Sequence, residues 1–153
     1  MSLEDLYRSV ILDHYRSARN KGTIENPDFH AIGDNPACGD QLEVFISFSK
    51  DGTVGDVKWN GEGCAICCAS SSIMTESVKE KSKQQIFELC EKVKRLIKGE
   101  PLDPSEKDDL GEATLQESIT AQQESGKAFA NLINVETTST KQMETVTSVI
   151  VFL

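Results

Sequence analysis

The sequence has no long hydrophobic run, and it has too few basic residues to balance its acidic ones. No stretch approaches the roughly 20 consecutive apolar residues of a membrane-spanning helix, so we expect no membrane segment. The first residues, MSLEDLYRSV, carry acids where a secretory signal peptide is basic, which favours a cytoplasmic location. With 16 Lys and Arg against 25 Asp and Glu, the net charge is -9, and repulsion from phosphate backbones argues against a nucleic-acid ligand.

Common catalytic signatures are also missing. The sequence shows no Ser/His/Asp pattern, no phosphate-binding glycine loop and no dinucleotide fingerprint. Of the two histidines, His14 lies on the apolar side of a predicted helix, where packing is the better interpretation, and His30 lies in a predicted loop. The cysteine count of five is odd, which argues against a disulfide framework in a reducing compartment. The clustered cysteines are therefore the candidate metal ligands or reactive thiols.

Hydrophobic periodicity predicts an α+β fold with a small antiparallel β-sheet and helices packed on one face. The sheet is predicted from two strands, 42–48 and 54–59, joined by a turn at Lys50-Asp51-Gly52. Helices are predicted over 3–15, 65–81, 84–98 and 110–134, with a loop over 23–40 and an exposed acidic connector over 101–109. We expect a single domain over 1–134 and a divergent tail over 135–153 that is poorly ordered or strand-like.

A first candidate site lies in the segment NPACGD, residues 35–40. Gly39 permits a sharp turn, so Cys38 and Asp40 could reach one point. A thiolate and a carboxylate together suit zinc or ferrous iron. The alternative is a simple turn in which Asp40 accepts hydrogen bonds from backbone amides.

A second candidate is the segment GEGC, residues 61–64. Cys64 stands just before the helix predicted from Ala65, as its N-cap or in its first turn, where the positive helix end favours a thiolate. A thiolate can be a metal ligand or a sulfur nucleophile, whereas the alternative is a small buried apolar residue.

Cys64 and Cys67 form a C-x-x-C pair, which suits a redox dithiol or half of a metal site. A thioredoxin-like protein would place this pair after a parallel strand, and the predicted hairpin upstream argues against that. Cys68 lies about 100° further round the helix than Cys67, so we interpret it as core packing. Cys90 lies on the apolar face of its helix and is interpreted in the same way.

The segments CGD (38–40), GEGCAI (61–66) and ASSSIMT (69–75) together resemble the U-type iron–sulfur cluster assembly proteins, the IscU, SufU and NifU N-terminal family. The resemblance also includes LYRSVILDHY (6–15) and LGEA (110–113), and it is closest to the SufU branch, because no LPPVK chaperone-binding segment is present. It implies a SufE/NifU-like α+β fold in which three cysteines and one aspartate gather at an exposed end.

The same resemblance implies a function and a set of site residues. Cys38, Asp40 and Cys64 would bind zinc, as in the SufU branch, or a [2Fe–2S] cluster, as in the IscU branch. Cys38 would accept persulfide sulfur from a PLP-dependent cysteine desulfurase, for delivery to apo iron–sulfur acceptor proteins. A structural zinc module without transfer activity and a thiol–disulfide redox protein using Cys64 and Cys67 are the alternatives.

The family pattern is not complete in this sequence. The segment F-P-x-R-x-K-C that carries the third cysteine of the family falls on residues 122–128. There only Lys127 matches, and Ala128 stands at the cysteine position. Lys127 is expected to orient or electrostatically support the site, or else to be a solvated helix lysine. Three interpretations of this departure are open. The tail is a frameshifted or divergent reading, or Cys67, at a position usually held by serine in the family, supplies the missing thiolate, or the protein has lost sulfur transfer and kept only a binding role.

Overall fold

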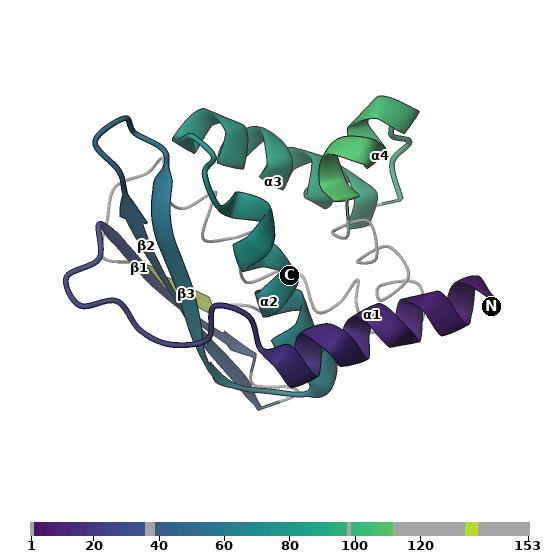
Figure 1. The fold of residues 1–153 in the computed structure, drawn as a ribbon, viewed down its shortest axis with the longest axis horizontal. Coiled ribbons are helices and arrows are strands. Elements are labelled where there is room, and N and C mark those ends of the chain that lie inside the picture. Colours follow the sequence, from purple (N-terminus) through teal and green to yellow (C-terminus); the bar gives the residue numbers. More distant parts are fainter. Residues whose placement is uncertain (1, 36–38, 98, 112–133, 138–153) are drawn as a thin grey trace.

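The computed structural model describes residues 2–35, 39–97, 99–111 and 134–137 of the 153-residue chain (Figure 1). Within them the chain forms an α+β fold, as predicted from the sequence. The four strands form one antiparallel sheet in the order β3-β2-β1-β4, and α1, α2 and α3 lie on one side of it. The elements are α1 (Leu3–Ser17), β1 (Phe29–Asn35), β2 (Asp40–Phe48), β3 (Val54–Glu62), α2 (Ala65–Val78), α3 (Lys83–Ile97), α4 (Pro104–Leu110) and β4 (Asn134–Thr137).

The core lies between the sheet and the helices. Trp59, Val57 and Ile46 face it from the hairpin of β2 and β3, and each is almost completely buried. Ile73 and Met74 of α2 and Val93 of α3 fill the other side. The helix α2 contacts both α1 and β3, so it forms the centre of this packing (Figure 1).

The sequence predicted the helix α1 correctly, because residues near its N-terminus stabilise that end. Ser2 is its N-cap: its hydroxyl accepts a hydrogen bond from the Asp5 N–H, and the Asp5 carboxylate accepts one from the Ser2 N–H. These bonds lower the pKa of Asp5, chiefly through the Ser2 side chain. The helix ends at Ser17, before Ala18 in the left-handed conformation.

Two segments predicted as irregular are in fact regular elements. The predicted loop over 23–40 contains β1, whose alternating Phe29 and Ala31 are buried in the core. The predicted connector over 101–109 contains most of α4, which begins at Pro104 after an Asp103 N-cap. Both predictions were wrong because short elements with few apolar residues carry little hydrophobic periodicity.

The predicted tail is strand-like where it is described. The strand β4, residues 134–137, pairs antiparallel with β1. The predicted helix over 110–134 lies mostly outside the described residues, but its last residue, Asn134, belongs to β4, so the prediction was wrong at that end. The domain boundary at 134 stays a prediction. In the described part of the chain, no helix has both the length and the hydrophobicity that a membrane crossing requires.

Candidate metal and thiol site

The β2–β3 hairpin brings the two candidate segments to one end of the sheet. The strand register pairs Gln41 with Glu62, so the start of β2 lies beside the end of β3. Asp40, at the start of β2, is buried with 8% of its surface exposed. Its Oδ1 accepts a hydrogen bond of 3.1 Å from the backbone N–H of Cys64. The pairing of two strands therefore joins residues 24 positions apart in the chain.

Cys64 is the N-cap of α2, as the sequence predicted. Its backbone is extended, with φ -66° and ψ 167°, and its carbonyl accepts the first helical bond from the Cys68 N–H. Its Sγ accepts a hydrogen bond of 3.5 Å from the Cys67 N–H. The Cys64 side chain is exposed, so this sulfur is both held by the helix terminus and open to solvent.

Two glycines make this arrangement possible. Gly61 has φ +132°, and a Cβ there would collide with the Gln41 carbonyl of the neighbouring strand. A Cβ at Gly63 would lie 2.9 Å from Asp40 Oδ1 and also 2.9 Å from Cys67 Sγ. The carboxylate oxygen and the Cys67 sulfur are therefore separated by no more than the sum of those two distances. The GEG segment thus brings Asp40, Cys64 and Cys67 to one locality.

The other predicted site residues are not described. Cys38 lies outside the described residues, between the paired Asn35 and Asp40. Gly39 has φ +69°, in the left-handed region that the sharp turn predicted for it requires. Lys127 and Ala128 also lie outside the described residues, so the roles of Cys38 and Lys127 stay predictions.

The model of the NifU-like N-terminal domain family matches residues 6–128 of the chain. The chain belongs to this family. It is 36% identical over 119 residues to the zinc-dependent sulfurtransferase SufU of Bacillus subtilis, covering 78% of both chains. It is 34% identical over 113 residues to the iron–sulfur cluster assembly scaffold protein IscU of Streptococcus pyogenes, covering 74% of this chain and 69% of the relative. The family resemblance predicted from the sequence is confirmed.

Solved structures of the family share the fold. An iron–sulfur cluster assembly scaffold protein of the SUF system from Fervidobacterium islandicum superposes with a TM-score of 0.68 at 28% identity, covering 78% of this chain and 85% of that one. A NifU-like protein from Brucella abortus superposes with a TM-score of 0.63 over 96% of this chain and 89% of that one. The identity of the second is 19%, so it supports the fold alone.

The donor types at the site fit zinc or iron, but the described residues do not complete a set. Asp40, Cys64 and Cys67 provide a carboxylate and two sulfurs, which are ligands that zinc accepts. Among the described residues, however, no group of three His, Cys, Asp or Glu side chains is arranged to hold a metal ion. A family-type metal site therefore needs a donor from outside those residues, or a rearrangement of the three.

The remaining described cysteines belong to the core, as predicted. Cys68 is 8% exposed, and its thiol donates a weak hydrogen bond of 3.7 Å to the Gly63 carbonyl. The pKa of the Cys68 thiol is raised, chiefly by burial, so little of it is present as the nucleophilic thiolate. Cys90 is buried on α3. None of the four described cysteines forms a disulfide.

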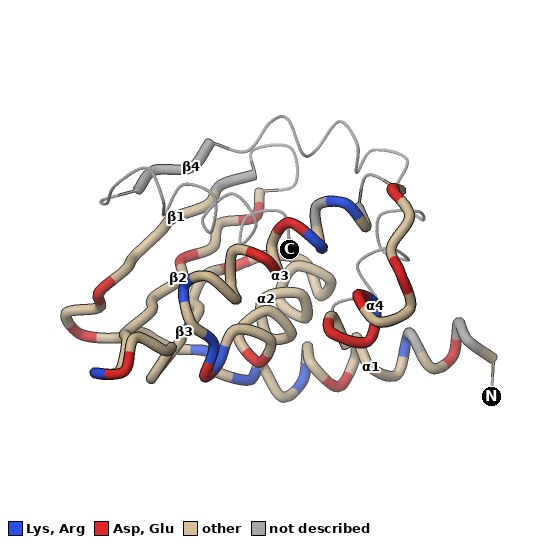
Figure 2. The backbone as a smooth tube through the Cα atoms, turned by 90° about the horizontal axis from the view of Figure 1, so that it is seen from above, with Lys and Arg blue, Asp and Glu red and all other residues tan. Residues whose placement is uncertain are grey.

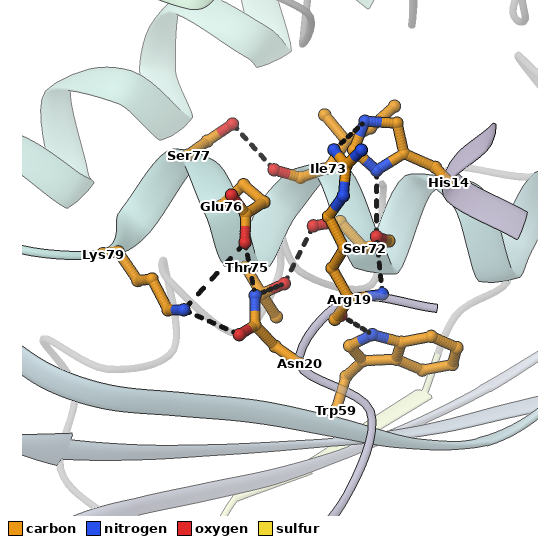
Figure 3. A network of polar contacts seen from close by, with 10 residues as sticks. All are labelled: His14, Arg19, Asn20, Trp59, Ser72, Ile73, Thr75, Glu76, Ser77 and Lys79. Carbon is orange, nitrogen blue, oxygen red and sulfur yellow. Dashed lines mark hydrogen bonds and ion pairs between the residues drawn. The ribbon is translucent and has the colours of Figure 1, made fainter. Parts of the chain in front are cut away.

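His14 is a packing residue, as predicted, but it is also part of a hydrogen-bond network that the sequence did not reveal (Figure 3). Its Nδ1 lies 2.9 Å from Ser72 Oγ on α2, and its Nε2 lies 3.3 Å from Arg19 Nη1. Because a guanidinium only donates, Nε2 accepts and Nδ1–H donates to Ser72. Arg19 in turn accepts the Trp59 indole N–H on its carbonyl, at 2.8 Å. The network joins α1, α2 and β3.

His30 was predicted as a loop residue, and that was wrong. It lies in β1, its ring stacks on Phe45 with centroids 4.5 Å apart, and its Nε2 lies 3.1 Å from Glu43 Oε2. Both partners come from β2, so His30 takes part in pairing the strands. It has no contact with the candidate site among the described residues.

Proposed function

We propose that this chain is a cytoplasmic iron–sulfur cluster assembly protein that accepts sulfur from a PLP-dependent cysteine desulfurase. It holds zinc or a nascent [2Fe–2S] cluster and serves apo iron–sulfur acceptor proteins. The observation that carries the proposal is the Asp40 carboxylate, buried and bonded to the N–H of the helix-capping Cys64. The similarity to a zinc-dependent sulfurtransferase and to cluster scaffold proteins supports it.

The proposed ligands are Cys38, Asp40 and Cys64, with Cys67 as a candidate fourth donor at the vacancy left by Ala128. A bound zinc would supply a positive charge that keeps the cysteines as thiolates. The Asp40 carboxylate already lies against Cys64, because its Oδ1 accepts a hydrogen bond from the Cys64 backbone N–H. Lys127 is proposed to support the negative charge of the site.

Cys38 is the proposed acceptor thiolate. Its Sγ forms a bond to the outer sulfur of the desulfurase persulfide while the bond between the two persulfide sulfurs breaks. The desulfurase cysteine leaves as a thiolate, and Cys38 carries the persulfide, so atoms and electrons balance. The net negative charge of the chain favours a docking surface of positive charge on the desulfurase.

The proposal is tested by adding the purified chain to a cysteine desulfurase with cysteine as substrate. We expect the chain to accelerate alanine release, because an acceptor removes the persulfide that otherwise stalls turnover. Cys38→Ser is expected to abolish the acceleration, whereas Cys90→Ser, in the core, serves as the control. Tight zinc binding without any acceleration by the parent chain would instead identify a structural zinc module.

A further inference from the structure

Cys67 lies one helical turn from Cys64 and on the same side of the site. Cys64 is the N-cap of α2 and Cys67 is its third residue, so the two side chains are neighbours at the helix surface. The Cys67 N–H donates to Cys64 Sγ, and the Cys67 Sγ lies against Gly63, where a side chain would displace it. Cys67 is half-buried, whereas Cys64 is exposed.

We propose that Cys67 is a resolving thiol that releases sulfane sulfur carried on Cys64 as sulfide. The inference rests on the proposed function, because it needs persulfide sulfur to reach Cys64, either directly or by exchange from another cysteine of the chain. It assigns Cys67 a catalytic role in sulfur reduction, in addition to sulfur acceptance and metal binding.

The reaction balances within the chain. The Cys67 thiolate attacks Cys64 Sγ, the inner sulfur of the persulfide, and forms a Cys64–Cys67 disulfide. The bond from Cys64 Sγ to the terminal sulfur breaks, and that sulfur leaves as HS⁻ with the electron pair. The two cysteines thereby supply the two electrons that convert sulfane sulfur into sulfide, the oxidation state found in clusters. A small or protein dithiol reductant then restores the pair.

The spacing of the two residues suits this reaction. Side chains three residues apart on a helix have Cβ atoms about 5–6 Å apart, whereas a disulfide needs Cβ atoms about 3.5–4.5 Å apart, so the pair has to close by about 1–2 Å. Cys64 has extended rather than helical dihedral angles, so its side chain is not held in the helical direction. A disulfide between them therefore needs only local adjustment at the helix start.

The neighbouring cysteines do not fit the role. Cys68 is buried in the core cluster, with its thiol bonded to the Gly63 carbonyl. Cys90 lies on another helix and is also in the core cluster. Among the described cysteines, Cys67 is the thiol that lies beside Cys64 and outside the fully buried core.

The test uses the full chain with Cys38→Ser, so that Cys64 receives the sulfur. The reduced protein is mixed with one equivalent of glutathione persulfide, and sulfide and intact protein mass are followed over time. The chain with Cys67 is expected to release sulfide and to lose two hydrogens, with the Cys64–Cys67 link found in its peptides. In the double variant that carries both Cys38→Ser and Cys67→Ser, the persulfide is expected to stay on Cys64. Sulfide release from this variant is expected to be slower by about tenfold or more, because the intramolecular thiol is lost.

Cys68→Ser is the matched control and is expected to release sulfide at the parent rate. Equal rates of sulfide release with and without Cys67 would overturn the inference. So would sulfide release from the Cys38→Ser chain without formation of a Cys64–Cys67 disulfide. If Cys67→Ser folds poorly, the peptide analysis of the parent still decides. Because glutathione persulfide bypasses the desulfurase, failure here leaves the alanine-release test of the proposed function unaffected.

Discussion

Replacing Ser72 by alanine should weaken the fold far more than the same change at its neighbour Ser71. Ser72 Oγ accepts from His14 Nδ1–H at 2.9 Å and from the Arg19 backbone N–H at 3.1 Å, both across elements of the fold. His14 is completely buried, so its ring N–H could find no water after the change. Ser71 is also buried, but its hydroxyl donates to the Cys67 carbonyl of its own helix.

The magnitude follows from these contacts. Leaving a buried donor without an acceptor costs about 1–3 kcal/mol. The higher helix propensity of alanine offsets about 0.5 kcal/mol of this cost. We therefore expect Ser72→Ala to lower the free energy of unfolding by about 0.5–2.5 kcal/mol. Ser71→Ala should change it by less than about 0.5 kcal/mol, because the Cys67 carbonyl keeps its helical hydrogen bond.

Urea unfolding followed by far-ultraviolet circular dichroism measures both values, with the slope on denaturant checked for constancy. Because Ser71 bonds the carbonyl of Cys67, a residue of the candidate site, both variants should also be compared for sulfur acceptance. We expect sulfur acceptance to be unchanged in Ser72→Ala. Similar losses of stability in the two variants would refute the argument that the His14 network, rather than burial of any serine on α2, stabilises the fold.

Two further predictions concern charged groups. Asp40→Asn should keep the hydrogen bond from the Cys64 N–H but weaken zinc binding by about tenfold or more, because a negatively charged ligand is lost. Competition with a chromophoric chelator measures the zinc affinity. An unchanged affinity would show that Asp40 is not a zinc ligand. The pKa of Glu106 lies below its ordinary value of 4.5, mainly because its carboxylate accepts from the Asp103 N–H and then because it pairs with Arg95. A carboxylate whose pKa is lowered by folding stabilises the fold at pH values above its ordinary pKa. This stabilisation is lost as the pH falls through the pKa that the group has in the folded state. Parent and Glu106→Gln should thus differ in Tm at neutral pH and converge well below pH 4.5, whereas a difference that persists in acid would contradict this assignment.

Features that depend on neighbouring residues were predicted correctly. The position of Cys64 as N-cap follows from GEGC before a helical pattern, and the turn at Lys50-Asp51-Gly52 follows from its residue types. The burial of Cys68 and Cys90 follows from helical periodicity. These signals act within one or two turns of chain, so the sequence expresses them directly.

Elements stabilised by distant partners were missed or misjudged. The strand β1 exists because β2 and β4 pair with its two edges, although its own sequence includes Gly33 and polar residues. The helix α4 buries Leu110 and is otherwise fixed by end contacts such as the pair of Arg95 with Glu106. The partners of His14 and His30 lie on other elements, and no local pattern identifies them.

The sequence by itself determined the family, the α+β class and the candidate residues Cys38, Asp40 and Cys64, because motif and spacing are properties of the chain. Only the tertiary structure decided that the Asp40 carboxylate meets the Cys64 N–H, because strand register sets which residues of β2 and β3 are neighbours. It also decided that the Cys67 sulfur turns toward Gly63 and Asp40, whereas Cys68 enters the core. That direction depends on how α2 packs against α1 and β3, and this packing involves residues from the whole length of the core.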